Sequence, residues 1–293
     1  MQTSLFNYDF PKELVAQQPL PRREESRMMV VDRKSGRWEH KKFPDLPSCL
    51  KEGDLLVLNN AEADLIELNG RRVPPLPPYI RRKRPEDFTE QDYERYRTVY
   101  AKIPGSKAAP TAGFHFTEEG LRSIQKMGVL IAEVTLQVGY DTYKPIRSET
   151  IEDHPMHGEE YVIPEETAQA VLSAKKEKRR VIAVGTTVVR ALESWGLPSL
   201  NVREGPGVSY ETKLFINPGF QFQIVDTLLT NFHRPRTTVL VMVSAFASLK
   251  RGYGGHGPLW AREGGRELIL SAYEEAIRER YRLFSYGDCM LII

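Results

Sequence analysis

Apolar runs separated by turn residues predict the first strands of the chain. Met28–Asp32 and Leu55–Leu58 are short, largely apolar runs bounded by Ser-Gly and Glu-Gly turns, a pattern typical of buried strands. The stretch Arg71–Ile80 is dense in proline, which fixes the backbone and removes an amide donor. It therefore predicts an extended linker rather than a helix or a central strand.

Two helices are predicted by the residues at their ends. Thr117 can cap a helix that runs through Gly120–Met127, and the β-branched stretch Val129–Gly139 that follows is typical of a strand. Pro164–Glu166 places a proline and two acids in the first turn of a second helix. Lys175–Arg180 supplies cations near the end of that helix, where they interact favourably with the helix dipole.

Strands and helices continue to alternate in the second half of the chain. The apolar Val181–Val184 predicts a buried strand that leads into a helix over Val188–Trp195, and the long apolar run Thr237–Ala247 predicts a strand in the middle of the sheet. Apolar residues at three- and four-residue spacing between Leu268 and Tyr281 predict an amphipathic helix. The predicted fold class is α/β, with a mixed sheet covered by helices.

Composition is that of a globular chain. Of the 293 residues 41% are hydrophobic and 27% are charged, and the mean hydropathy is −0.42, which excludes a disordered or fibrous protein. The sequence has no apolar run of about 18 residues and no leader-like start, so we expect a cytoplasmic protein with no membrane contact. Cys49 and Cys289 are too few for a disulfide framework or a cysteine zinc site, and no metal is expected.

Local charge carries more information than the formal net charge of +2. A tight basic run is followed by two further arginines among tyrosines, a mixture of cations and stacking surfaces that suits a nucleic acid. A solvated surface loop is the alternative, because charge runs are common on surfaces. The basic residues are Arg81, Arg82, Lys83, Arg84, Arg95 and Arg97.

The loop before the helix capped by Thr117 is a first candidate site. Gly113 permits close approach of the backbone, while Thr111 and His115 supply polar groups between apolar neighbours. His115 could act as a general acid or base near neutral pH. The alternative is a hydrogen-bonded structural histidine.

A second candidate loop joins a predicted strand to a predicted helix. Gly185, Thr186 and Thr187 place amides and hydroxyls at a helix N-terminus, and Arg190 adds a guanidinium, an arrangement that favours a phosphate or carboxylate. The alternative is an ordinary threonine cap with a surface arginine. Neither a Walker loop nor a G-x-G-x-x-G motif occurs, which argues against a nucleoside triphosphatase and a Rossmann dehydrogenase.

Two further loops carry polar groups beside aromatic residues. Asn231 and His233 flank Phe232 before an apolar run, and Tyr286 and Asp288 follow the last predicted helix. A carboxylate beside an aromatic face suits a cationic ligand, whereas the alternative for Asp288 is a structural turn residue. No nucleophile signature such as G-x-S-x-G occurs in the sequence.

These loops, taken together and in this order, resemble one family, the S-adenosylmethionine:tRNA ribosyltransferase-isomerases of queuosine biosynthesis. The resemblance spans nearly the whole chain. The blocks that carry it are Phe6–Leu20, Ser26–Asp32, Gly53–Asn59, Leu76–Ile80, Tyr96–Ser106, Ala108–Phe116, Val184–Arg190, Leu229–His233, Val243–Ala247 and Tyr281–Leu291.

The resemblance implies transfer and isomerisation of the ribosyl moiety of S-adenosylmethionine onto 7-aminomethyl-7-deazaguanine at the wobble position of tRNA, which gives epoxyqueuosine, adenine and methionine. S-adenosylmethionine is then a co-substrate, no cofactor is bound, tRNA is the partner, and we expect a monomer. By residue type, His115 and His233 would carry protons, and Asp288 with Tyr286 would face the sulfonium. Substrate contacts would come from Thr111, Gly113, Gly185, Thr186, Thr187, Arg190 and Asn231.

The chain also departs from the family pattern. Asn59–Ala63 reads Asn-Asn-Ala-Glu-Ala where the family has Asn-Asp-Thr-Arg-Val, and Gln137 replaces a histidine. These departures leave two alternative functions. One is a paralogue that uses the same donor on a small-molecule acceptor, and the other is a catalytically silent RNA-binding relative.

The resemblance further implies a β-barrel domain between the equivalents of Leu58 and Leu76. This domain is either deleted from the chain or left out of the sequence. We therefore expect a main α/β domain in two parts, residues 1–60 and 84–293, joined by a short bridge over residues 61–83.

Overall fold

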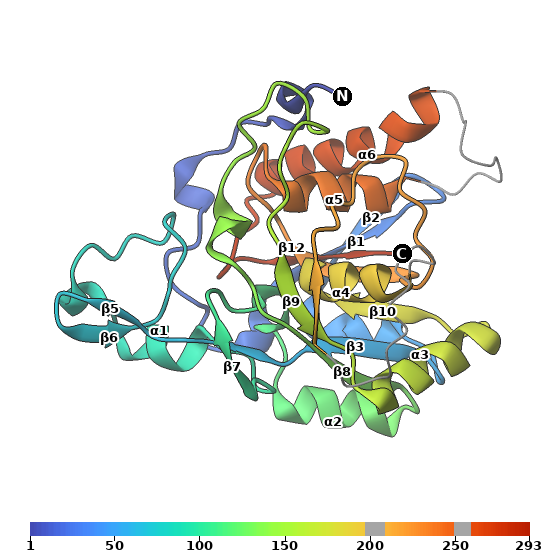
Figure 1. Ribbon diagram of the computed structural model, residues 1–293, viewed down its shortest axis with the longest axis horizontal. Coiled ribbons are helices and arrows are strands. Elements are labelled where there is room, and N and C mark those ends of the chain that lie inside the picture. The colour runs from blue at the N-terminus through green and yellow to red at the C-terminus, as the bar shows by residue number, and fades with distance from the viewer. Residues whose placement is uncertain (197–208, 249–258) are drawn as a thin grey trace.

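A mixed nine-stranded sheet forms the centre of the molecule, with the strand order β11-β9-β8-β3-β10-β12-β13-β1-β2 (Figure 1). The computed structural model describes residues 1–196, 209–248 and 259–293. The predicted α/β fold class is confirmed. The strands of this sheet are β1 (Arg27–Asp32), β2 (Arg37–Lys42), β3 (Leu55–Asn59), β8 (Leu130–Leu136), β9 (Glu159–Val162), β10 (Val181–Val184), β11 (Ser209–Thr212), β12 (Thr227–Asn231) and β13 (Cys289–Ile292).

Four neighbouring strands of the sheet are parallel. β3 pairs in parallel with both β8 and β10, and β10 pairs in parallel with β12. β13 then runs antiparallel to β12, and the strands beyond β8 are also antiparallel. The carboxyl ends of β8, β3, β10 and β12 therefore meet at one edge of the sheet.

Helices cover both faces of the sheet, and the alternation of side chains along each strand explains why. In β3, Leu55 and Val57 pack into the core beneath α3, α4, α5 and α6, whereas Leu56 and Leu58 pack on the opposite face with α2 and a 3-10 helix. A strand that is buried on both faces has a continuous apolar sequence. The helices are α1 (Glu90–Arg95), α2 (Glu118–Lys126), α3 (Glu165–Lys176), α4 (Thr186–Gly196), α5 (Thr238–Ala247) and α6 (Leu259–Arg278).

Short 3-10 helices connect these elements. They cover Thr3–Phe6, Lys12–Leu14, Arg23–Glu25, Phe43–Cys49, Pro85–Asp87, Thr111–Gly113 and Tyr140–Tyr143. Within the described ranges, no helix has both the length and the hydropathy needed to cross a bilayer.

Local sequence signals place several helix ends correctly. The side chain of Thr117 accepts a hydrogen bond from the amide of Gly120 at the start of α2. Helix α3 begins after Pro164 with two glutamates in its first turn and ends with two lysines in its last turn, as predicted. The predicted strands around Met28, Leu55 and Val181 are also confirmed, as β1, β3 and β10.

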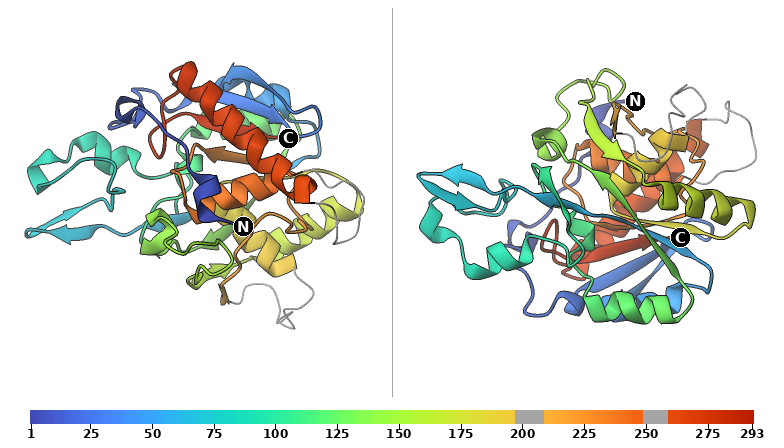
Figure 2. Two further views of the ribbon diagram at one scale, coloured as in Figure 1. Left: turned by 90° about the horizontal axis from the view of Figure 1, so that it is seen from above. Right: turned by 60° about the horizontal axis from the view of Figure 1, so that its bottom comes forward.

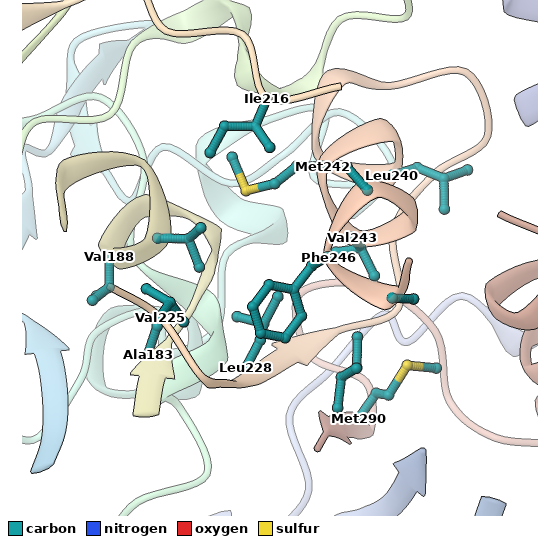
Figure 3. Packing of buried hydrophobic residues seen from close by; sticks show 14 of the residues in the cluster. Ala183, Val188, Ile216, Val225, Leu228, Leu240, Met242, Val243, Phe246 and Met290 are labelled. Atoms are coloured by element: carbon teal, nitrogen blue, oxygen red, sulfur yellow. The ribbon is translucent and has the colours of Figure 1, made fainter. Parts of the chain in front are cut away.

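The prediction of a strand over Thr237–Ala247 is wrong, because this segment forms the helix α5. The side chain of Thr237 caps the helix by accepting from the amide of Leu240. Helix α5 packs against the sheet and against α6, so it is apolar on nearly all sides and its sequence lacks helical periodicity. Figure 3 shows Phe246 of α5 directed towards Leu228 of β12.

A smaller lobe extends from the main sheet and contains a two-stranded hairpin and α1 (Figure 2). Asn69 and Gly70 join the hairpin strands with φ angles of 47° and 77°, which suit the tight turn of a hairpin. Part of the predicted linker Arg71–Ile80 is thus a strand, and the division of the chain into residues 1–60, 61–83 and 84–293 stays a proposal. The small strands are β4 (Ala61–Ala63), β5 (Ile66–Leu68), β6 (Arg71–Val73) and β7 (Ile103–Ser106).

Candidate active site

A cleft with two adjoining lobes opens where the parallel strands end. The main lobe has an empty volume of about 640 Å³, and segments that follow β8, β10 and β12 line it. The second lobe has an empty volume of about 570 Å³ and shares Thr142, Thr186, Thr187 and Val239 with the first. The carboxyl edge of parallel strands is where open α/β sheets bind ligands.

The loop between β10 and α4 forms the wall shared by the two lobes. Gly185 has a φ of +94° and donates its amide to the carbonyl of Leu229 at 2.8 Å, so the chain turns sharply into the helix. Thr187 Oγ1 accepts a hydrogen bond from Asn59 Nδ2 at 3.1 Å. The predicted loop of Gly185, Thr186 and Thr187 therefore lies in the cleft, where the start of α4 favours an anion.

Arg190 lines the second lobe, but its charge is already neutralised. Its guanidinium forms a buried ion pair with Glu159 and donates to the carbonyls of His157, Thr212 and Leu214. The prediction that Arg190 offers a free cation to a substrate anion is therefore corrected. The residue instead fixes the wall of the second lobe.

A chain of hydrogen bonds leads from the main lobe to His115. Thr111 Oγ1 donates to Asn231 Oδ1 at 2.9 Å, and Asn231 Nδ2 lies 3.5 Å from His115 Nε2. His115 Nδ1 lies 2.8 Å from Ser26 Oγ, which donates to the carbonyl of Arg23 at 3.3 Å. The donors and acceptors all match if the neutral ring of His115 carries its proton on Nδ1.

Burial keeps both candidate histidines neutral. It lowers the pKa of His115 to about 3, with further lowering by the charges of Arg23 and Arg282. Burial alone lowers the pKa of His233 to about 3, and its Nε2 lies 2.8 Å from Thr230 Oγ1. Both rings are therefore neutral near pH 7 and make hydrogen bonds that fix their neighbours. The proton-carrier roles of His115 and His233 stay predictions.

Asp288 does not line either lobe, so its predicted contact with a sulfonium is corrected. Its carboxylate accepts from the amides of Arg27 and Arg282, each at 2.8 Å, and thereby ties β1 to the loop before β13. Burial raises the pKa of Asp288. Tyr286 is also buried, and its hydroxyl donates to Asp92 Oδ1 at 3.2 Å.

Gly113 is explained by the fold rather than by a ligand. A Cβ at this position would lie 1.9 Å from the hydroxyl oxygen of Tyr100 and 2.8 Å from Cγ2 of Thr98. The close approach expected at Gly113 is thus made by side chains of the protein itself. Thr111 and Ala112, which precede Gly113 in the same loop, do line the main lobe.

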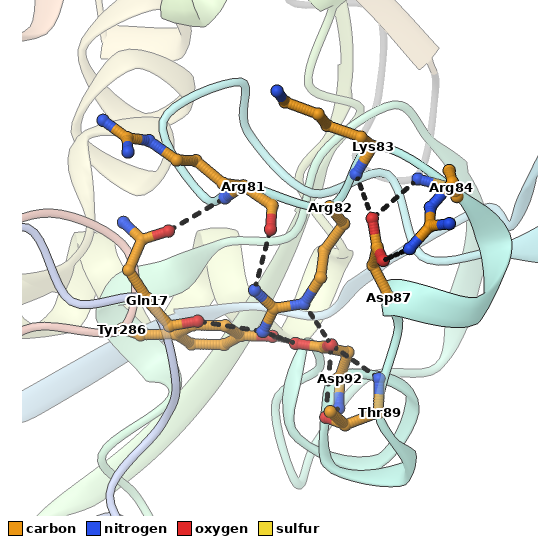
Figure 4. A network of polar contacts seen from close by, with 9 residues as sticks. All are labelled: Gln17, Arg81, Arg82, Lys83, Arg84, Asp87, Thr89, Asp92 and Tyr286. Carbon is orange, nitrogen blue, oxygen red and sulfur yellow. Dashed lines mark hydrogen bonds and ion pairs between the residues drawn. The ribbon is translucent and has the colours of Figure 1, made fainter.

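Only part of the predicted basic strip is available to a partner. Figure 4 shows Arg82 turned inward to Asp92, with Nε to Oδ2 at 2.8 Å and a side chain 8% exposed. Arg84 pairs with Asp87 at 3.2 Å, and Arg97 pairs with Glu62 at 3.1 Å. Arg95 donates from Nη1 to two backbone carbonyls, which leaves its charge without a paired carboxylate among the described residues. Arg81 and Lys83 are exposed, and their backbone amides make the contacts drawn in Figure 4.

Aromatic side chains that residue-by-residue reasoning did not single out form one side of the main lobe. Tyr79 lies edge-on to Tyr143, with ring centroids 5.9 Å apart, and its hydroxyl lies 2.7 Å from Ser285 Oγ. Phe284 packs against Tyr79 at a centroid distance of 5.1 Å. The block Leu76–Ile80, which contains Tyr79 and resembles the family, was the available signal in the sequence.

Among the described residues, no group of His, Cys, Asp and Glu side chains is arranged to hold a metal ion. The cleft instead offers hydroxyls, amides, a helix N-terminus and aromatic faces. An open α/β sheet with such a cleft at its carboxyl edge is typical of proteins that bind a small molecule, and this lining suits one with both anionic and flat apolar parts.

Comparison with known proteins identifies the family. The family model described as "Queuosine biosynthesis protein" matches residues 3–74 and 63–292, and the chain belongs to this family. The expected family and enzyme class, a transferase-isomerase, are thereby confirmed. The two matches overlap between residues 63 and 74, at the place where the sequence predicts a short bridge.

Similar proteins cover the whole chain. The S-adenosylmethionine:tRNA ribosyltransferase-isomerase of Rubrobacter xylanophilus is 40% identical over 361 residues, which include 100% of this chain and 98% of the relative. That of Carboxydothermus hydrogenoformans is 40% identical over 365 residues, with 100% of both chains covered. Both alignments are longer than the 293 residues of this chain, so the relatives carry segments without a counterpart here.

A solved structure agrees with the fold. The crystal structure of S-adenosylmethionine tRNA ribosyltransferase from Thermotoga maritima superposes with a TM-score of 0.65 at 30% sequence identity. The match covers 99% of this chain and 100% of that chain.

Proposed function

We propose that this enzyme transfers and isomerises the ribosyl moiety of S-adenosylmethionine onto 7-aminomethyl-7-deazaguanine in the wobble position of tRNA. The products are epoxyqueuosine in the tRNA, adenine and methionine. One observation carries the proposal. Ala108–Phe116, Val184–Arg190 and Leu229–His233, three blocks that resemble the family and lie far apart in the sequence, contribute residues to the same cleft.

The lining of the cleft suits the parts of the donor. The start of α4 with Thr186 and Thr187 favours a carboxylate, such as that of the methionine part. The rings of Tyr79, Tyr143 and Phe284 offer faces and edges to a flat base or a sulfonium cation. Two adjoining lobes can separate the nucleoside end of the donor from its amino-acid end.

The chemistry of the donor explains why the cleft lacks a strong nucleophile. The sulfonium acidifies the 5′-carbon and supplies a leaving group, so the protein mainly positions the reactants and excludes water. Asn231 is the central positioning residue in this proposal, because its amide group joins Thr111 in the main lobe to the neutral ring of His115.

A small-molecule acceptor is the second candidate, and the state of the basic strip favours it. Arg82 is buried against Asp92, which removes one cation from the strip as a surface for a polyanion. Such a paralogue would use the same donor and cleft, and its activity would depend little on salt.

The test is to incubate the protein with S-adenosylmethionine and tRNA that carries the deazaguanine precursor, and to measure free adenine and the mass of the modified nucleoside together. We expect both products. An Asn231→Ala variant should lower kcat/KM roughly 100-fold, because a small misplacement of reacting groups has effects of this order. Gln169→Ala, which removes an exposed amide on α3, is the matched control and should keep full activity.

Each other outcome identifies a different function. Adenine released only in the presence of a small amine acceptor would replace tRNA by that acceptor. Binding of tRNA without release of adenine under any condition would indicate a silent RNA-binding relative and would refute the proposed reaction.

A further inference from the structure

A small hollow beside His115 is lined by two arginines and two aromatic rings. Arg23, Arg95, Phe114 and Tyr286 form what we call the arginine hollow, which has an empty volume of about 260 Å³. His115 also lines it, and Ser285 lines both the hollow and the main lobe of the cleft. The hollow is therefore a neighbour of the cleft but is not part of its lining at the ends of β8, β10 and β12.

Backbone carbonyls hold the two guanidinium groups in place. Arg23 donates from Nη1 to the carbonyl of Phe114 at 3.2 Å and from Nη2 to the carbonyl of Glu94 at 3.1 Å. Arg95 donates from Nη1 to the carbonyls of Leu20 and Pro21 at 2.8 and 3.0 Å. Carbonyl groups fix the geometry of a guanidinium but leave its full positive charge uncompensated.

Two of the nearby carboxylates pair with other cations, while the charges of Glu24 and Glu94 also act on Arg95. Glu24 pairs with Arg22 at 2.6 Å, and Asp92 pairs with Arg82 at 2.8 Å. In the part of the chain that the structure describes, no carboxylate lies within ion-pair distance of Arg23. The pKa of Arg23 is lowered to about 10 by burial and by the neighbouring charges of Arg95 and Arg97.

Arg95 Nε, a guanidinium nitrogen of an arginine that lines the hollow, is buried and lacks a hydrogen-bond partner. Arg282 Nη1 is also buried without a partner, and the charge of Arg282 acts on His115. Buried donors without acceptors are rare in folded proteins. Fixed cations with spare donors match the oxygen atoms of a phosphate group, which arginine binds through charge-assisted hydrogen bonds.

We propose that the arginine hollow binds a backbone phosphate of the RNA acceptor, held by Arg23 and Arg95. The surroundings of the hollow favour an RNA strand over a free anion. The Tyr286 hydroxyl donates to Asp92, which pairs with Arg82, so Tyr286 in the lining of the hollow is linked to the run that carries the exposed Arg81 and Lys83 (Figure 4). The rings of Phe114 and Tyr286 are buried and form the apolar part of the lining of the hollow. This inference rests on the proposed function only in taking RNA as the acceptor.

The experiment measures binding rather than turnover, so that it stands apart from the test of the reaction. The affinity of the full chain for an anticodon stem-loop RNA is followed by fluorescence anisotropy over a series of salt concentrations. Arg23→Gln and Arg95→Gln should each weaken binding and make the slope of log K against log salt shallower, by at most about 0.7 to 0.9, the value of one lost phosphate contact. The affinity for S-adenosylmethionine, measured by calorimetry, should not change.

Arg37→Gln is the matched control, because it removes the same charge from an exposed position. Arg37, the first residue of β2, lies opposite Asp32 at the end of β1. The hollow is lined by Ser26, which precedes the first residue of β1. The salt slope of Arg37→Gln should equal that of the parent. Arg95→Lys keeps the charge but loses the planar fork, so it should restore the salt slope and recover part of the affinity even if Arg95→Gln folds poorly.

Three results would overturn the inference. The first is a salt slope in Arg23→Gln and Arg95→Gln that matches Arg37→Gln. The second is weaker binding of S-adenosylmethionine with unchanged RNA binding, which would assign the hollow to the donor carboxylate. The third is failure of Arg95→Lys to restore the slope. Absence of adenine release, by contrast, would refute the proposed reaction while the RNA-binding result still decides the role of the hollow.

Discussion

Removal of the Asp92 carboxylate tests whether the buried ion pair organises the smaller lobe. Asp92 is fully buried in α1, where it accepts from Arg82 Nε at 2.8 Å, from Arg82 Nη2 at 3.1 Å and from the amide of Thr89 at 2.9 Å. Tyr286 also donates to it. In Asp92→Ala these donors lose their acceptor, and the guanidinium of Arg82, which is 8% exposed, stays buried without a counter-charge.

The expected cost follows from this geometry. Removal of one partner of a buried ion pair costs about 3–5 kcal/mol. Arg82 keeps hydrogen bonds to the carbonyls of Gln17 and Arg81, so we expect a loss of about 3 kcal/mol, at the lower end of the range. Asp92→Asn keeps the shape of the side chain and part of its hydrogen bonding, so its free energy of unfolding should fall by less than that of Asp92→Ala.

Urea unfolding followed by circular dichroism measures the free energy, and hydrogen exchange of the α1 amides shows whether the smaller lobe opens by itself. Glu86→Ala is the control beside the same basic run, because Glu86 makes only an exposed ion pair with Arg84. It should unfold at the urea concentration of the parent. A loss below about 1 kcal/mol in Asp92→Ala, with unchanged exchange in α1, would show that the pair does not stabilise the lobe.

Three further predictions concern the cleft and the core. The pKa of His115 and of His233 is about 3 in the fold and about 6.5 in the unfolded chain, so the unfolded state binds more protons and stability falls as pH is lowered from 6.5 towards 3. Each ring changes the free energy of unfolding by up to about 1.4 kcal/mol per pH unit. Measured by urea unfolding, this free energy should therefore fall less between pH 7 and pH 5 in His115→Asn than in the parent. Gly113→Ala places a methyl 1.9 Å from a hydroxyl and should lose about 1–3 kcal/mol in urea unfolding, whereas Gly264→Ala, in open space on α6, should be neutral or slightly stabilising. Arg190→Met leaves its buried carboxylate partner unpaired and should lower the free energy of unfolding by about 3–5 kcal/mol, and an unchanged denaturation midpoint would contradict this account.

Elements with a strong local signal could be predicted from the sequence. Helix α2 begins where Thr117 supplies a cap, and α3 carries acids at its start and lysines at its end. The strands β3 and β10 are short apolar runs between turns. In each case the residues that define the element are within a few positions of one another, so the chain itself contains the whole signal.

Helix α5 shows where such reasoning fails. Thr238–Ala247 is rich in β-branched residues and almost uniformly apolar, which is typical of a central strand. The segment is a helix because it is enclosed between the sheet and α6, where a helix can be apolar on every side. Which of two buried environments a run enters depends on distant parts of the chain.

For the candidate site, too, some features could be predicted from the sequence and others could not. The sequence by itself determined which loops carry polar groups, and three of these loops, around Thr111, Thr187 and Asn231, do line the cleft. Only the tertiary structure decided which charged groups are free. It pairs Arg190 with Glu159 and directs Asp288 to two backbone amides. The physical reason is that a charge buried in a low-dielectric interior must find its partner within a few ångströms in space, and that partner can lie anywhere in the sequence.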